Sequence, residues 1–334
     1  MLPRLLLDPT ARPARCADAA AEAGLGALGT ATPQRAFLLI ELALPWPKDV
    51  LDHPELAGLR AVLPDEGGVR VQAVRAETFD PDRRAVIACA AMPPPGVGYR
   101  QASRAVPPAD IVGSCLEVLA DATSSALTDD PSPTTTMVDL LICTHGQRDV
   151  CCGSFGMALA ADLLVDPPPG VRVWRTSHLG GHRHAPTALT FPDGHMWARL
   201  DRTSARQIAT RSGDAAEVAH LDRGACSLSD CWVQAADSTV LAVEGWSWLT
   251  TPRHHRTLTT EGEGTAVRIR AAEDTVVHLV AMNGRAVHVP DGCRKDTDAA
   301  MVELLDISIT DHNHQRGAHR RDVATPEGET SWTR

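Results

Sequence analysis

The stretch CTHGQRDVCCGSFG, residues 143–156, carries three cysteines and a histidine directly after an apolar run, MVDLLIC (137–143). A short apolar run bounded by turn residues is typical of a buried strand. The next segment, GSFGMALAADLL (153–164), has the apolar spacing of a helix. The sequence around residue 143 therefore predicts a strand that ends at Cys143, a loop that carries thiols, and a helix.

The same alternation continues downstream. VRVWRTS (171–177) predicts a strand that delivers His178 at its end, and the segments on either side of Pro-Asp-Gly (192–194) predict two paired strands. TSARQIATRSG (203–213) then predicts a helix. The expected order is β-α-β-β-β-α, which indicates a compact α/β layer.

Upstream and downstream segments favour additional modules, and no internal repeat is visible in the sequence. RAFLLIEL (35–42) and RAVIACAA (84–91) predict buried strands, and TVVHLVAMNGRAVHVP (275–290) predicts two strands joined at Asn283-Gly284. We expect six regions: an N-terminal arm with little regular structure (1–34), an α/β region (35–123), a linker (124–136), the layer described above (137–229), a small α+β module (230–310) and a flexible tail (311–334).

Composition narrows the class of protein. The chain has 334 residues and a formal net charge of −10, which argues against a nucleic-acid partner. No apolar run approaches the length of a membrane helix, and the N-terminus lacks the apolar centre of a signal peptide. The nine cysteines do not suggest a disulfide scaffold in such a long chain. We therefore expect a cytoplasmic protein with reduced thiols and no membrane contact.

Four side chains fall in loops at the carboxyl ends of predicted strands: Cys143, one of Cys151 or Cys152, His178 and His182. The two histidines flank Gly180 and Gly181, and glycines allow the positive φ angles of a tight loop. Two thiolates and two imidazoles suit zinc or an iron–sulfur cluster, and neither magnesium nor calcium. The spacing alone predicts a metal site but leaves the metal and the choice between the vicinal cysteines open.

The form C-T-H-G-x-R-D-x-C-C-G-x-x-G at 143–156, followed by RTSHLGGHRHAPTALTFPDGHMWARLD (175–201), resembles the sucrase/ferredoxin-like family. The second segment is similar to the second half of a thioredoxin-like ferredoxin, with His178 and His182 where cysteines usually stand. The resemblance covers residues 137–223 well and 33–51 more weakly. It implies a thioredoxin-like ferredoxin module, preceded by the α/β region and followed by the α+β module.

The resemblance also implies a ligand set, because members of the family are described with a [2Fe–2S] cluster held by two cysteines and two histidines. Carried over to this chain, the ligands are Cys143, Cys152, His178 and His182. Cys152 is preferred to Cys151 because a Cys-Gly-x-x-Gly pattern leads from it into the helix. His145 and His184 are candidate partners of the ligands, and Arg148 and Asp149 are expected to be solvated charges or a pair that braces the loop.

The expected function is electron transfer with a reductase or oxidase as redox partner. Two neutral imidazoles make the centre less negative than four thiolates do, so we expect a potential above that of plant-type ferredoxins and dependent on pH. Two alternatives remain open: a binding protein with zinc at the same four ligands, and a thiol redox enzyme that uses Cys151 and Cys152. A glycosidase is not indicated, because the sequence shows no pair of facing carboxylates.

Overall fold

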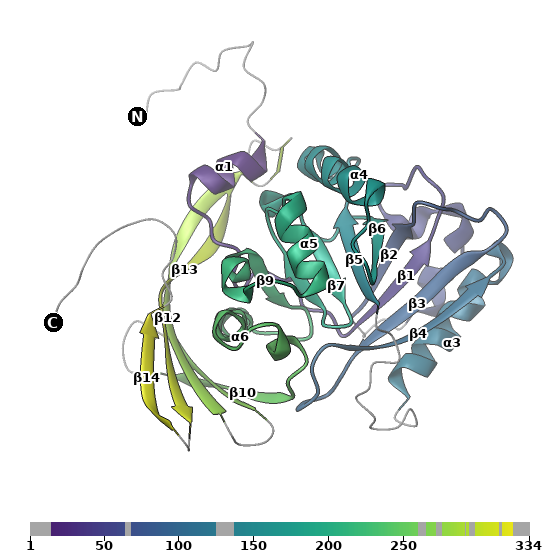
Figure 1. The fold of residues 1–334 in the computed structure, drawn as a ribbon. Helices are drawn as coiled ribbons and strands as arrows, with labels where there is room; N and C mark the ends of the chain where they lie inside the picture. Colours follow the sequence, from purple (N-terminus) through teal and green to yellow (C-terminus); the bar gives the residue numbers. More distant parts are fainter. Residues whose placement is uncertain are drawn as a thin grey trace, which may run out of the picture.

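Two sheets organise the chain in the computed structural model, which describes residues 15–63, 68–124, 137–259, 265–271, 276–290, 292–293, 298–313 and 316–322. One sheet has nine strands in the order β4-β3-β1-β2-β6-β5-β7-β8-β9, and the other has five in the order β10-β11-β12-β13-β14 (Figure 1). Residues 125–136 of the expected linker lie outside the described residues.

The N-terminal half of the large sheet comprises β1 (Ala36–Glu41), β2 (Val69–Arg75), β3 (Arg84–Ala91) and β4 (Tyr99–Val106), followed by α3 (Ile111–Thr123). β1 and β2 are parallel, whereas β3 pairs antiparallel with β1 and β4 antiparallel with β3. The segment HPELAGLRAVL (53–63) has helical apolar spacing but forms a 3-10 turn (Pro54–Leu56) and α2 (Leu59–Val62), because Gly58 adopts a φ of 87° between them.

The C-terminal half of the sheet repeats this topology. It comprises β5 (Val138–Cys143), α4 (Met157–Val165), β6 (Val171–Thr176), β7 (Ala188–Phe191), β8 (His195–Trp197) and α5 (Arg202–Thr210). β5 and β6 are parallel, β7 lies antiparallel on the other side of β5, and β8 pairs antiparallel with β7. The order β-α-β-β-β-α is confirmed, and it is that of a thioredoxin-like fold. The fold thus contains a structural repeat that the sequence does not show.

The two halves meet at a narrow seam and share a core. β2 and β6 pair antiparallel through only two residue pairs, Val74 with Thr176 and Arg75 with Arg175. Alternate residues of β1 and β5 point to a common cluster that includes Phe37, Leu39, Leu141 and Cys143. The helices α4 and α5 pack on the other face of the C-terminal half. The end of β5, with Cys143, therefore lies in the core that the two halves share.

The region 137–229 ends with β9 (Asp222–Ala225), which adds a strand to the large sheet. In the C-terminal module, α6 (Cys231–Glu244) packs against the second sheet (Figure 1). The five strands of that sheet are β10 (Arg253–Thr259), β11 (Thr265–Ala271), β12 (Val276–Pro290), β13 (Asp298–Asn313) and β14 (Arg316–Asp322). The turn expected at Asn283-Gly284 is wrong, since β12 pairs along its length with β13 and these residues sit beside a register shift. The tail expected from residue 311 begins as strand, because β13 and β14 pair there.

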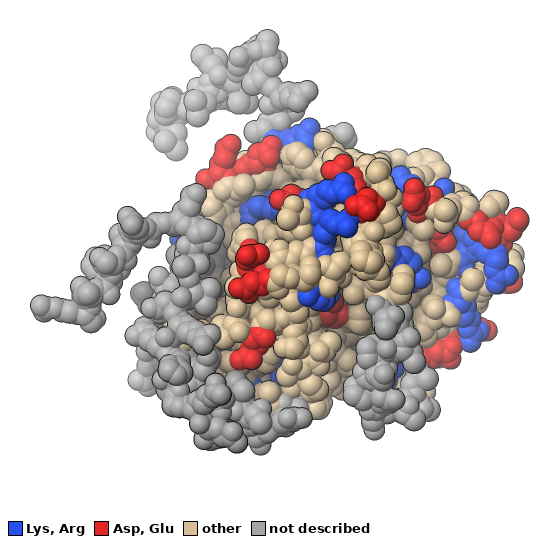
Figure 2. Space-filling model, in the orientation of Figure 1, with Lys and Arg blue, Asp and Glu red and all other residues tan. Residues whose placement is uncertain are grey.

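The expected arm contains a helix, α1 (Cys16–Glu22), which contacts β12 and the segment His182–His184. Ala20 of α1 packs with Leu25 and Val289, so β12 anchors this part of the chain. On the surface, acidic and basic side chains are interleaved on the face shown in Figure 2. Within the described ranges, every helix falls short of the length and apolar character needed to cross a bilayer.

Candidate metal centre

The first two predicted ligands lie on β5 and on the turn that leads into α4. Cys143 is the last residue of β5, and Cys152 begins a π-helical turn, Cys152–Gly156, of the kind often found at functional sites. This turn sits directly on the end of the strand: a Cβ on Gly156 would lie 1.8 Å from the carbonyl oxygen of Cys143. Glycine at this position therefore allows the close approach that sets Cys152 beside Cys143.

Cys143, Cys152 and His178 form one donor group, with one ligand atom from each within 4.8 Å of the others. The Sγ of Cys152 lies 3.9 Å from Nδ1 of His178. The hydrogen bond from Cys152, with help from His178, holds the pKa of Cys143 well below its ordinary value despite burial. That same hydrogen bond, together with burial, raises the pKa of Cys152. The lowered pKa favours the thiolate form of Cys143, which is the form in which cysteine binds a metal.

The N-terminal half of the sheet positions His178. Arg70 and Gln72 of β2 donate to its carbonyl oxygen, at 2.6 and 3.3 Å. The preceding residue, Ser177, donates to Oε1 of Gln72 at 2.7 Å. His145, expected as a partner of the ligands, accepts from the backbone N–H of His178 at 3.3 Å. Burial lowers the pKa of His145, which keeps its ring neutral and able to accept.

The loop between the two histidines has the conformation expected from its glycines. Gly180 and Gly181 adopt φ angles of 89° and 73°. A Cβ on Gly181 would lie 2.4 Å from Nη2 of Arg223, and Nη1 of the same side chain donates to the carbonyl oxygen of Gly180 at 3.1 Å. The buried guanidinium of Arg223 therefore holds the backbone of the loop, and it occupies the space that a side chain at residue 181 would need.

His182 lies beside the donor group but makes contacts of a different kind. Its ring is stacked on that of His178, with centroids 6.2 Å apart. Its Nδ1 lies 3.1 Å from Sγ of Cys16 and 3.5 Å from Oδ2 of Asp149. The structure therefore brings Cys143, Cys152 and His178 together and places His182 next to them, with Nδ1 directed to a second cluster.

The second cluster consists of Cys16, Cys151, Cys293 and Asp149, whose ligand atoms also lie within 4.8 Å of one another. Cys151 belongs here rather than with Cys143, and Asp149 is only 9% exposed, which contradicts its expected place as a solvated charge. Hydrogen bonds from Cys16 and Cys293 lower the pKa of Cys151 to about 6 against the effect of burial. Sequence reasoning missed Cys16 and Cys293, because they lie 135 and 142 residues away from Cys151.

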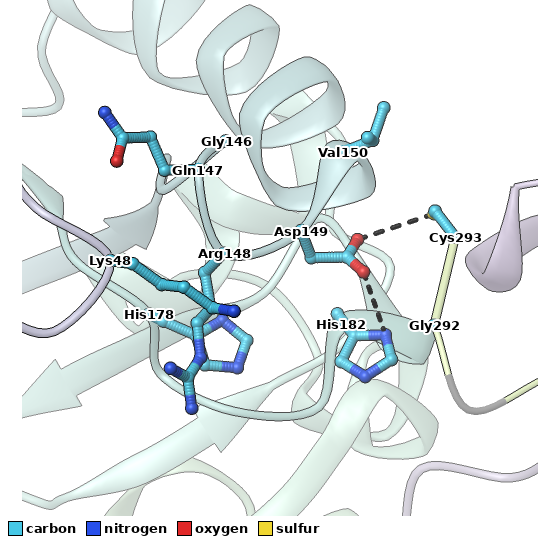
Figure 3. A pocket seen from close by; sticks show the side chains of 10 residues that line it. All are labelled: Lys48, Gly146, Gln147, Arg148, Asp149, Val150, His178, His182, Gly292 and Cys293. Atoms are coloured by element: carbon cyan, nitrogen blue, oxygen red, sulfur yellow. Dashed lines mark hydrogen bonds and ion pairs between the residues drawn. The ribbon is translucent and has the colours of Figure 1, made fainter. Parts of the chain in front are cut away.

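A cavity of about 470 Å³ opens between these groups. Figure 3 shows the imidazoles of His178 and His182 below the segment 146–150, and Asp149 between His182 and Cys293. Lys48 and Arg148 also line this cavity. Of the four predicted cluster ligands, the two histidines line the cavity, whereas Cys143 and Cys152 are buried.

The other candidate partner, His184, lies inside the protein. It is 1% exposed, and burial lowers its pKa to about 2, so the ring is neutral at physiological pH. Neither of its ring nitrogens has a hydrogen-bond partner among the described residues. His184 is therefore a buried neutral group near the loop rather than a partner that orients a ligand.

The donor set, two soft sulfurs with imidazoles at the ends of β5 and β6, fits zinc or an iron–sulfur cluster. The family model described as Sucrase/ferredoxin-like matches residues 27–224, which is more than half of the chain. No curated protein matches the chain, and no solved structure matches it. The matched range includes both halves of the large sheet and all four predicted ligands.

Proposed function

Because the chain belongs to the sucrase/ferredoxin-like family, we propose that it is an electron carrier with one [2Fe–2S] cluster bound by Cys143, Cys152, His178 and His182. The observation that supports this most is the convergence of Cys143, Cys152 and His178, from three separate segments, to within 4.8 Å. When bound, the cluster supplies one-electron exchange at a centre with neutral and anionic ligands.

The chain's own residues hold the imidazoles for this role. Arg70, Gln72 and His145 fix the backbone of His178. Ligation of His182 through Nε2 would keep Nδ1 on Asp149, the arrangement in which a carboxylate orients a ligating histidine. Both imidazoles line the cavity, so a proton on either ring can exchange with solvent. This supports a potential that depends on pH and lies above that of plant-type ferredoxins.

The same cavity suggests how a redox partner would approach. The charged side chains of its lining are two cations, Lys48 and Arg148, and one carboxylate, Asp149, so the lining is net positive although the chain as a whole carries −10. We propose a reductase or oxidase whose docking surface is acidic, because opposite charges speed encounter between proteins. The cytoplasm is the proposed compartment, since none of the nine cysteines, all of them among the described residues, is in a disulfide.

The test is anaerobic purification followed by iron and sulfide analysis, visible absorption and EPR spectroscopy of the dithionite-reduced protein. We expect a reddish-brown protein with about two iron and two sulfide per chain. Cys152→Ser should lose the cluster, and Cys231→Ser, at an exposed cysteine, is the matched control. His182→Cys should keep a cluster with a lower potential, because a thiolate adds negative charge. A colourless protein with zinc bound at Cys143 and Cys152 would refute the proposal.

A further inference from the structure

We propose that Cys16, Cys151, Cys293 and Asp149 form a second metal site, for a thiophilic divalent cation of the zinc class. This site is separate from the proposed cluster and does not rest on it. Its four residues come from α1, from the loop after β5 and from the loop after β12. No ligand of the proposed cluster belongs to the set.

The three sulfurs form a small triangle. Sγ of Cys151 lies 3.0 Å from that of Cys293 and 3.6 Å from that of Cys16, and the third side, between Cys16 and Cys293, measures 3.4 Å. Tetrahedral zinc with bonds of about 2.3 Å to sulfur separates two thiolates by roughly 3.8 Å. A small outward movement of each thiol therefore admits the ion.

A carboxylate occupies the fourth position. Oδ1 of Asp149 lies 3.5 Å from Sγ of Cys293 and 3.9 Å from Sγ of Cys16. The backbone N–H of Cys151 donates to the same oxygen at 2.8 Å, which fixes the orientation of the carboxylate. Carboxylate oxygen completes zinc sites that also contain thiolates and imidazoles.

Burial favours a cation over four unmetallated acids. Cys16 and Cys151 are 0% exposed and Asp149 is 9% exposed. Three thiols and a carboxylate enclosed together repel as soon as more than one of them is ionised. A divalent cation offsets this charge and can contact all four donors, whereas a disulfide joins only two of the three sulfurs. The convergence of all four donors on one point therefore favours an ion.

The site would join parts of the chain that are distant in sequence. Cys16 belongs to α1, Cys293 follows β12, and Cys151 precedes Cys152 of the proposed cluster. An ion at this point holds α1 and the second sheet against the loop that carries Cys152. Cys16 and Asp149 both contact Nδ1 of His182, at 3.1 and 3.5 Å, so the two centres are direct neighbours.

The experiment measures zinc and iron in the full-length protein purified anaerobically without chelator, by inductively coupled plasma mass spectrometry. The variants are Cys16→Ser, Cys293→Ser and Cys143→Ser, with Cys231→Ser as the control at an exposed cysteine. We expect about one zinc in the wild type and in Cys231→Ser. Cys16→Ser and Cys293→Ser should bind zinc at least about tenfold more weakly and keep their iron. Cys143→Ser should lose iron and keep zinc, which separates this proposal from the proposed function.

Co²⁺ added to the zinc-depleted protein is a second probe, because thiolate-to-cobalt charge-transfer bands report sulfur ligation directly. The bands should form in Cys143→Ser and be weaker in Cys293→Ser, which has lost one of the three sulfur ligands. Cys293 is a partly exposed loop residue, and circular dichroism of this variant checks that its fold is intact. Zinc retained in both Cys16→Ser and Cys293→Ser, or lost in Cys143→Ser, would overturn the proposal. So would a Cys151–Cys293 disulfide found by alkylation and mass spectrometry in the wild type.

Discussion

Replacing Gly156 by alanine tests how closely α4 must approach β5 for the donors to meet. The added Cβ would lie 1.8 Å from the carbonyl oxygen of Cys143 and 3.0 Å from its carbonyl carbon. Ordinary contact begins near 3.4 Å, so the turn and the strand must separate by about 1.6 Å. The obstacle is backbone, which cannot rotate away as a long side chain can.

The expected cost follows from two opposing effects. Alanine is favoured over glycine in a helical conformation by roughly 0.5–1 kcal/mol. Overpacking costs about 1–3 kcal/mol, occasionally more, and a backbone obstacle belongs at the upper end. We therefore expect Gly156→Ala to lower the free energy of unfolding by about 2 kcal/mol and to shift Cys152 away from Cys143, with loss of iron.

Gly113→Ala is the matched control, because Gly113 lies in α3 and a Cβ there meets nothing within 4 Å. This variant should be as stable as the wild type or about 0.5–1 kcal/mol more stable. Urea unfolding followed by circular dichroism gives the stability, and visible absorption gives the iron content. If Gly156→Ala keeps both stability and full iron content, the close packing of the turn on β5 does not set the site.

Three further outcomes are expected. Arg253 and His255 donate to the 0% exposed carboxylate of Asp237 at 2.6 and 2.8 Å. Asp237→Asn should destabilise the protein by about 3–5 kcal/mol in urea unfolding, because the guanidinium of Arg253 would be left buried without its counter-charge. Unchanged stability would contradict this. Although burial alone would raise it, Arg253 and His255 hold the pKa of Asp237 well below its ordinary value. The contribution of Asp237 to the free energy of unfolding should therefore be complete above about pH 4 and fall as the pH drops further. A difference in unfolding free energy between wild type and Asp237→Asn that stays constant down to the acid transition would argue against this. Arg70→Met should lower iron occupancy by freeing the carbonyl of His178, whereas Arg60→Met, at an exposed arginine, should not, and equal iron content in the two variants would exclude this role of Arg70.

The potential of the proposed cluster should fall as the pH rises from about 6 to 10, by at most about 59 mV per pH unit for one proton. The sign follows because the added electron raises the affinity of the imidazoles for protons, so reduction is favoured where protons are abundant. Protein-film voltammetry of the wild type and His182→Cys gives both profiles, and a flat wild-type profile would exclude ligation by ionisable imidazoles.

The local pattern of apolar residues in the sequence was sufficient to predict the strands that are almost completely buried. β1 and β5 are buried along nearly all their length, so their apolar runs are unambiguous in the sequence. β4 was not predicted, because its central and C-terminal residues are partly or fully exposed and it is a strand only by pairing with β3. The turn predicted at Asn283-Gly284 was wrong because pairing with a distant strand also decides the structure there. The pairing of β12 with β13 overrides the local turn preference of these two residues.

For the candidate site, the sequence predicted what local geometry controls and missed what distant packing controls. Cys143 and His178 were expected at strand ends and lie there, and Gly180 and Gly181 adopt the expected positive φ angles. The contacts of Asp149 with Cys16 of α1 and with Cys293 in the loop after β12, by contrast, span 133 and 144 residues. No local pattern around residue 149 indicates them.

The seam between the two halves of the large sheet limits how this protein can be dissected. The hydrogen bonds that hold the carbonyl of His178 come from β2, on the far side of a junction made by two residue pairs. A fragment that begins at β5 would contain every proposed cluster ligand yet would lack Arg70, Gln72 and half of the shared core. If the half of the sheet that carries the ligands were moved into another scaffold, that scaffold would have to supply a strand in place of β2, with donors for the carbonyl oxygen of His178.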